Sequence, residues 1–167
     1  MSDISEAIRS GIQRIGEPPM YFAGTAFAVT ERYASSQRGA IYETIMEDIL
    51  INENHDVCPR LSASHDCIGD GIKTELKGAM SLRGNAKPRC IFNHIGFDKD
   101  WQRIIFMCLT TDNKIHIAWH DRDTLILLGV LEHQQGGKSS TNDDYMVIDS
   151  EKIFDLSVAC DVAVYQL

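Results

Sequence analysis

The sequence predicts an α/β fold, with a mixed central β-sheet flanked by helices, in a single domain over residues 1–167. Three observations carry this prediction: an amphipathic helical pattern at 39–52, a strand–turn–strand pattern at 61–80, and a continuous apolar run at 104–109. A chain of this length is long enough to bury a real core. Its 44% apolar and 24% charged residues are ordinary for a globular protein, which excludes disordered and collagen-like classes.

Two segments have helical periodicity. Apolar residues at helical spacing predict a first helix over 2–15, and a Gly-Glu-Pro-Pro sequence at 16–19 ends it. Residues 1–36 are therefore expected to form an N-terminal helical extension. The segment 39–52 is the clearest helix, because Ile41, Ile45 and Ile49 form one apolar ridge. Glu43 lies at the edge of that apolar stripe.

The middle of the chain predicts strands. Residues 61–68 and 72–80 flank Gly69-Asp70-Gly71, a strong turn signal, and together predict a β-hairpin. The apolar run 104–109 predicts a strand that is buried on both faces. The remaining expectations are a turn at 112–114, a neighbouring strand at 115–119, either helix or strand at 123–131, a loop at 136–140 and a short strand at 145–148.

The cysteine pattern and the distribution of charge limit the classes of protein to which this chain can belong. The five cysteines form no C-x-x-C pair, so we expect reduced thiols in a cytoplasmic protein, without a disulfide framework or a zinc site. The N-terminus has no signal-peptide pattern and no apolar run is long enough for a membrane span. The net charge is −8, yet residues 73–103 carry seven basic and three acidic side chains, or +4, which leaves −12 elsewhere. This basic segment indicates a face that meets nucleic acid.

Three charged residues of the hairpin carry the predicted chemistry. Strand alternation places Glu75 and Lys77 on one face and turns Leu76 toward the core. The turn at 69–71 reverses the chain, which places Asp66 opposite residues 73–75. Two carboxylates beside an ammonium suit Mg²⁺, which takes one or two carboxylates together with substrate phosphate. Asp70 is a competing first carboxylate, but we favour Asp66 because a side chain inside the turn would point away from Glu75.

The sequence Glu75-Leu76-Lys77, after an acid on a preceding strand, resembles the PD-(D/E)xK nuclease superfamily, in particular type II restriction endonuclease-like proteins. The resemblance covers roughly residues 37–140. It includes Arg38-Gly39 leading into the helix with Glu43, the segment 89–95 followed by Trp101, and a polar loop from His133 to Gly137. The chain departs from the family pattern at one position, where His65 and not proline precedes the first acid.

The resemblance implies a restriction endonuclease-like fold and a Mg²⁺-dependent endonuclease of double-stranded DNA, with Mn²⁺ as a substitute and a homodimer as the assembly. It implies that Asp66, Glu75 and Lys77 are catalytic, with Glu43 leaning toward them, and that Asp66, Glu75 and the Leu76 carbonyl bind the metal. The alternatives are a structure-specific nuclease for junctions or flaps, and a non-catalytic nuclease-like binding protein. The expected DNA contacts are Arg83, Lys87, Arg89, Asn93, His94 and Gln134, of which His94 fits a structural role equally well.

Overall fold

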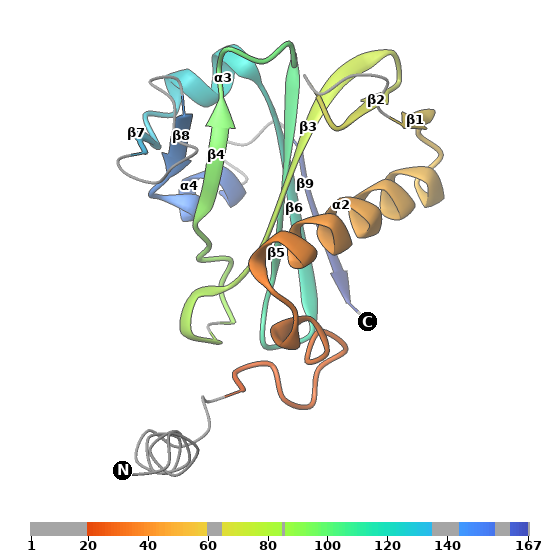
Figure 1. Ribbon diagram of the computed structural model, residues 1–167, viewed down its shortest axis with the longest axis vertical. Helices are drawn as coiled ribbons and strands as arrows, with labels where there is room; N and C mark the ends of the chain where they lie inside the picture. Colours follow the sequence, from red (N-terminus) through yellow and green to blue (C-terminus); the bar gives the residue numbers. More distant parts are fainter. Residues whose placement is uncertain (1–19, 60–64, 85, 135–143, 156–160, 167) are drawn as a thin grey trace, which may run out of the picture.

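The computed structural model describes residues 20–59, 65–84, 86–134, 144–155 and 161–166 (Figure 1). The predicted helix at 2–15 and the predicted loop at 136–140 lie outside these ranges. The main sheet has six strands in the order β1 (Val57–Pro59), β2 (Cys67–Gly69), β3 (Ile72–Met80), β5 (Arg103–Leu109), β6 (Lys114–Asp121) and β9 (Asp161–Gln166). All its neighbouring strands are antiparallel except β3 and β5, so the sheet is mixed.

A smaller antiparallel sheet accompanies the main one. Its order is β4 (Phe92–Gly96), β8 (Asp144–Val147) and β7 (Leu131–His133). The helices are α2 (Ser35–Asn52), α3 (Arg122–Leu127) and α4 (Ser150–Phe154), with 3₁₀ turns η1 (Thr30–Arg32) and η2 (Leu82–Gly84). The predicted class, an α/β fold with a mixed sheet flanked by helices, is confirmed at this level.

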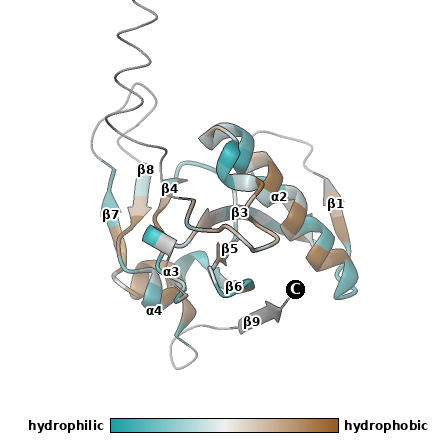
Figure 2. Cartoon of the chain, turned by 90° about the horizontal axis from the view of Figure 1, so that it is seen from below, coloured by the Kyte–Doolittle hydropathy of each residue, from teal (hydrophilic) through white to brown (hydrophobic). Residues whose placement is uncertain are grey.

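Helix α2 covers one face of the main sheet (Figure 1). Its hydrophobic residues recur between hydrophilic ones (Figure 2), and Tyr42, Met46 and Leu50 are buried. The helix approaches β3 closely at Gly78, where an added Cβ would lie 2.3 Å from the Tyr42 Cβ. The residues before the helix also join this core, since Phe22 is buried in the same cluster. The helix thus fixes the position of β3.

The second core lies on the other face of the main sheet, against the smaller sheet and α4. Strand β5 serves both cores, because Ile105 belongs to the α2 side and Phe106 to the opposite side. Every residue of β5 after Arg103 is buried, which confirms the strand predicted from the apolar run at 104–109.

A hairpin between β2 and β3 is confirmed, with Cys67 opposite Thr74. Its first strand covers Cys67–Gly69 and not the predicted 61–68, of which 61–64 lie outside the described ranges, and Gly69 belongs to the strand and not to the turn. The segment 123–131, for which sequence allowed helix or strand, divides into α3 and the start of β7. The helix buries Leu125, and Gly129 after it adopts a positive φ of 63°. The short strand near 145–148 is β8.

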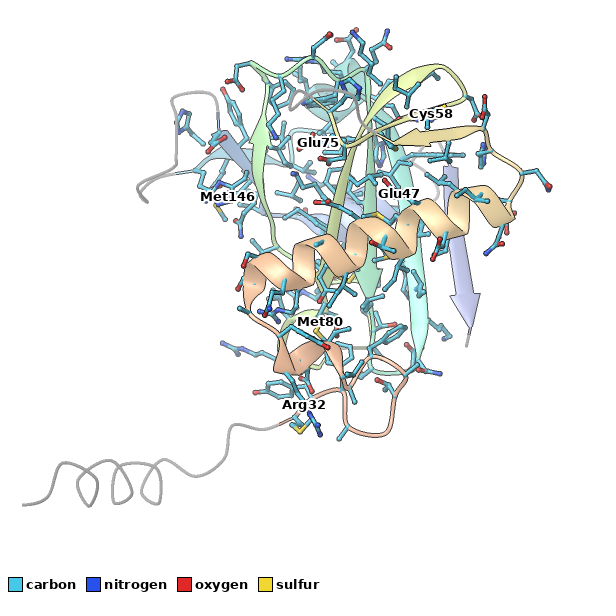
Figure 3. All side chains as sticks on the ribbon, turned by 45° about the vertical axis from the view of Figure 1, so that its right-hand side comes forward. Arg32, Glu47, Cys58, Glu75, Met80 and Met146 are labelled. Atoms are coloured by element: carbon cyan, nitrogen blue, oxygen red, sulfur yellow. A yellow bond between two sulfur atoms is a disulfide. The ribbon has the colours of Figure 1, made fainter. Side chains whose placement is uncertain are left out.

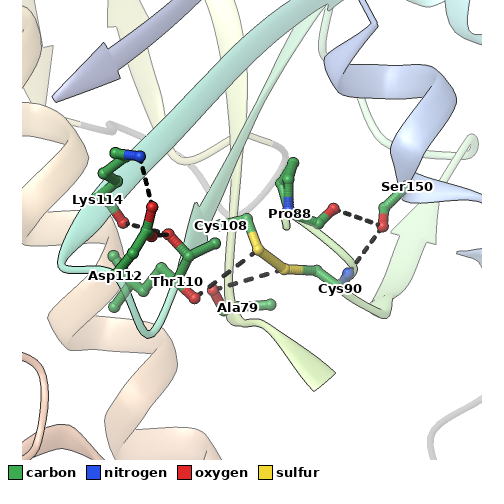
Figure 4. The surroundings of a disulfide bond; sticks show 9 residues. Ala79, Pro88, Cys90, Cys108, Thr110, Asp112, Lys114 and Ser150 are labelled. Carbon is green, nitrogen blue, oxygen red and sulfur yellow. Dashed lines mark hydrogen bonds and ion pairs between the residues drawn. A yellow bond between two sulfur atoms is a disulfide. The ribbon is translucent and has the colours of Figure 1, made fainter. Parts of the chain in front are cut away.

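The expectation that all cysteines are reduced thiols is wrong in this structure. Cys90 and Cys108 form a disulfide, with Cα atoms 6.4 Å apart (Figure 4). The Cys90 amide donates to Ser150 Oγ at 2.7 Å, which holds this segment against α4. Spacing along the chain did not indicate the pair, because the parallel crossover from β3 to β5 is what brings the two residues together. Among the described residues, Cys58 and Cys67 are free.

Candidate functional site

Strand β3 places Glu75 and Lys77 on one face, as the alternation predicts. Glu75 is completely buried, and its Oε1 accepts from Lys77 Nζ at 2.6 Å. The Lys77 side chain is 19% exposed, so the ammonium lies at the border between the buried carboxylate and solvent. Figure 3 shows Glu75 on β3, beyond the helix α2 that carries Glu47. A buried carboxylate of this kind is stable only beside a cation.

Asp66 lies directly before β2 and is bound to the strand that carries Glu75. Its backbone amide donates to the Thr74 carbonyl at 3.0 Å, and its Oδ2 accepts from the Leu76 amide at 2.8 Å. Burial, and next the negative charge of Glu75, raise the pKa of the Asp66 carboxyl. The two carboxylates therefore repel each other, and a cation between them would relieve that repulsion.

Asp70, the competing first ligand, is engaged elsewhere. Its Oδ2 lies 2.7 Å from His55 Nδ1, and its Oδ1 accepts from the Asp56 amide at 2.9 Å. The Asp56 hydrogen bond, followed by that of His55, lowers the pKa of Asp70. Asp70 thus joins the turn to the end of α2, and the geometry favours Asp66 as the partner of Glu75.

The second oxygen of Glu75 is the feature of the site that points to a ligand. Glu75 Oε2 is buried and has no hydrogen-bond partner, whereas Oε1 accepts from two ammonium groups. A buried unpaired carboxylate oxygen is costly, so a site that retains one is suited to a bound group. Asp66, Glu75 and the Leu76 carbonyl supply the hard oxygen ligands that Mg²⁺ prefers, and the site fits that ion.

The protein supplies few side-chain ligands to such an ion. Within the described part of the chain, no group of three or more His, Cys, Asp or Glu residues is placed to hold a metal. A site with two carboxylates is what Mg²⁺ uses when waters and substrate phosphate complete its coordination. Cys67, next to Asp66, is unsuited to act as a ligand or a nucleophile, because burial raises the pKa of its thiol to about 11.

Sequence reasoning missed one residue that contacts Glu75, and one carboxyl on α2 that is coupled to Asp66. Lys99, from the loop before β5, donates to Glu75 Oε1 at 3.1 Å. Glu47 lies on α2, and burial, together with the charges of Asp48 and Asp66, raises the pKa of its carboxyl. Glu43, the helix residue proposed from sequence, lies one turn earlier on the same side of the helix. In the structure, the carboxyl that feels the charge of Asp66 is Glu47. A role for Glu43 stays a prediction.

Three predicted DNA contacts lie in the loop after β3. Arg83 and Lys87 are exposed, and Arg89 Nε lies 3.3 Å from Glu151 Oε1. The loop is closed by a hydrogen bond from the Leu82 amide to the Arg89 carbonyl at 2.7 Å. It begins after Met80, five residues beyond Glu75 and therefore roughly 16 Å along the strand. This basic loop therefore follows the end of β3, whereas Glu75 lies within the strand.

The other predicted DNA contacts lie on the smaller sheet. The structure joins His94 and Gln134, since the His94 amide donates to Gln134 Oε1 at 2.9 Å. His94 Nδ1 also lies 3.3 Å from Asp144 Oδ2, and its backbone has a positive φ of 58° at an irregularity in the β4–β8 pairing. Asn93 beside it is exposed. A polar face is therefore present on β4, and Asp144 connects it to the carboxylate site through its charge on Lys99.

Comparison with known proteins gives no family. No protein-family model matches the chain, and a search of curated proteins finds no match. No helix in the described ranges is both long and apolar enough to cross a membrane.

Proposed function

We propose that this protein is a Mg²⁺-dependent DNA endonuclease with a PD-(D/E)xK-like site, of restriction type. One observation carries the proposal: Glu75 on β3 raises the pKa of Asp66, which directly precedes β2, and the Glu75 carboxylate beside Lys77 has one buried, unpaired oxygen. Asp66, Glu75 and the Leu76 carbonyl would hold the ion, for which Mn²⁺ can substitute. When bound, Mg²⁺ supplies charge stabilisation at the scissile phosphate and lowers the pKa of a water molecule.

The residues of the chain have separate roles in this proposal. Lys77, held by Glu75 at the border with solvent, orients the attacking water and stabilises the negative charge that develops on the phosphate. The Leu76 amide orients the Asp66 carboxylate. Hydrolysis adds water across one phosphodiester bond, with the hydroxyl going to phosphorus and the proton to the leaving oxygen. The basic segment 73–103 supports double-stranded DNA as substrate, and cutting both strands of a palindrome calls for a homodimer.

The test is cleavage of plasmid and phage DNA with Mg²⁺. Glu75→Gln and Lys77→Ala are each expected to cut at least about 10²-fold more slowly than wild type, because each removes a group that acts at the phosphate. Lys152→Ala is the control, since that side chain is exposed on α4 and we expect wild-type rates. Undiminished cutting by both site variants would refute the assignment.

The form of the products separates the two nuclease alternatives. Discrete bands from linear duplex support the restriction type. Cleavage confined to junction or flap substrates indicates a structure-specific nuclease. An absence of cleavage on every substrate, with DNA binding retained, would indicate a non-catalytic binding protein.

A further inference from the structure

Lys99 is a second cation at Glu75 and does not belong to the E-x-K sequence. Its Nζ lies 3.1 Å from Glu75 Oε1, compared with 2.6 Å for Lys77. The Lys99 side chain is 36% exposed, whereas that of Glu75 is 1% exposed. Lys77 is on a central strand and Lys99 on a loop. Of the two ammonium groups on this carboxylate, Lys99 therefore has the longer contact and the greater access to solvent.

The backbone of Lys99 is anchored by Arg122. Its carbonyl accepts from Arg122 Nη1 at 3.0 Å. The Arg122 guanidinium lies 4.9 Å from the ring centroid of Trp101 and 5.0 Å from that of Phe97. Trp101 is itself buried and donates to the Gly96 carbonyl at 2.7 Å. A fixed anchor with a long flexible side chain suits a cation that changes partners.

The charge of a second anion, Asp144, also acts on Lys99. The charges of Glu75, Asp66 and Asp144 all act on this ammonium. Asp144 belongs to β8 and pairs with His94, so it lies on the polar face of the smaller sheet. Lys99 is thus paired with Glu75, and it also feels the charge of an acid that pairs with His94, a predicted DNA contact.

We propose that Lys99 is a displaceable counter-ion, which neutralises Glu75 without metal and turns outward to a backbone phosphate when a divalent cation occupies the site. This inference rests on the proposed function. The buried Glu75 carboxylate cannot retain two ammonium groups and accept a divalent ion as well, because like charges within a few ångström repel strongly in a site of low dielectric. Lys99 is the one whose contact is longer and more exposed, so we expect it to leave while Lys77 stays.

The first experiment measures Mn²⁺ binding by calorimetry in the absence of DNA. Lys99→Gln removes the competitor, and we expect its Kd for Mn²⁺ to be about tenfold lower than in wild type. Lys99→Arg keeps the charge and should bind Mn²⁺ as wild type does. Lys114→Gln is the matched control, because Lys114 is equally exposed and pairs with Asp112 at the distant β5–β6 turn. Unchanged or weaker Mn²⁺ binding by Lys99→Gln would overturn the displacement.

The second experiment tests the phosphate contact by measuring DNA affinity with fluorescence anisotropy. The probe is a 30-base-pair duplex of mixed sequence in the presence of Mn²⁺. All the proteins compared retain Glu75, and incubations are kept short. Loss of one phosphate contact lowers the slope of log affinity against log salt by about one. We expect that loss in Lys99→Gln and a wild-type slope in Lys99→Arg and Lys114→Gln. An unchanged slope in Lys99→Gln would overturn the phosphate contact.

The two proposals fail in different ways. If wild type binds Mn²⁺ and cuts DNA while Lys99→Gln behaves as wild type in both experiments, the role of Lys99 is refuted and the nuclease assignment stands. If wild type neither binds Mn²⁺ nor cuts DNA, the proposed function and the displacement are refuted together.

Discussion

A buried carboxylate is the residue on which the site depends. Glu75 is inaccessible to solvent, yet only one of its oxygens is paired, and the neighbouring Asp66 adds repulsion. A carboxylate that served stability alone would be better replaced by an apolar side chain of similar size. The arrangement therefore costs stability at the place where the proposed cation binds, as is common at functional sites.

Asp66 provides a test of this cost. Its pKa is raised by burial first and by Glu75 second, so the unfolded chain loses the proton at a lower pH than the folded chain. The free energy of unfolding therefore falls as pH rises through that interval. Asp66→Asn keeps an oxygen acceptor for the Leu76 amide and removes the charge. We expect a higher urea midpoint than wild type at pH 7, no difference below about pH 3, and at least tenfold weaker Mn²⁺ binding.

The control for Asp66 is Glu132→Gln, an exposed carboxylate on β7 that is expected to change neither property. A lower urea midpoint for Asp66→Asn at pH 7 would show that the charge stabilises the fold, contrary to this account.

At the scale of elements, strand β3 organises the site through its two faces. One face carries Glu75 and Lys77, and the other packs Leu76 against the core under α2. Gly78 permits the close approach of the helix, since the nearest atom to an added Cβ is the Tyr42 Cβ, which cannot rotate away. The position of α2, and of Glu47 upon it, thus depends on a glycine three residues after Glu75.

Gly78→Ala tests this packing. The new Cβ would lie 2.3 Å from Tyr42 Cβ, so the helix must shift, and we expect a loss of about 1–3 kcal/mol in urea unfolding. Gly39→Ala is the matched control: this glycine lies within α2 with nothing near its added Cβ, and we expect a gain of up to about 1 kcal/mol. Equal midpoints for the two variants would contradict the packing described here.

At the scale of the whole molecule, local patterns in the sequence predicted part of the structure. Strand β3 has the predicted bounds, because alternation and a strong turn act within a few residues. Lys99 was not predicted, since its place beside Glu75 depends on Trp101 and Arg122 packing across the fold. The coupling of Glu47 to Asp66 was not predicted either, because periodicity gives the inner face of a helix but not its crossing of the sheet, and the role of Glu43 stays a prediction. The disulfide likewise depends on a crossover between strands.

The proposed endonuclease mechanism requires that a divalent cation binds between Asp66 and Glu75. Crystals grown with Mn²⁺ and measured near the manganese absorption edge test this most directly. We predict an anomalous peak in contact with both carboxylates, with the Lys99 ammonium moved away from Glu75. An ordered protein with no peak there, or with Mn²⁺ only at Asp70 and His55, would refute a metal site formed by Asp66 and Glu75.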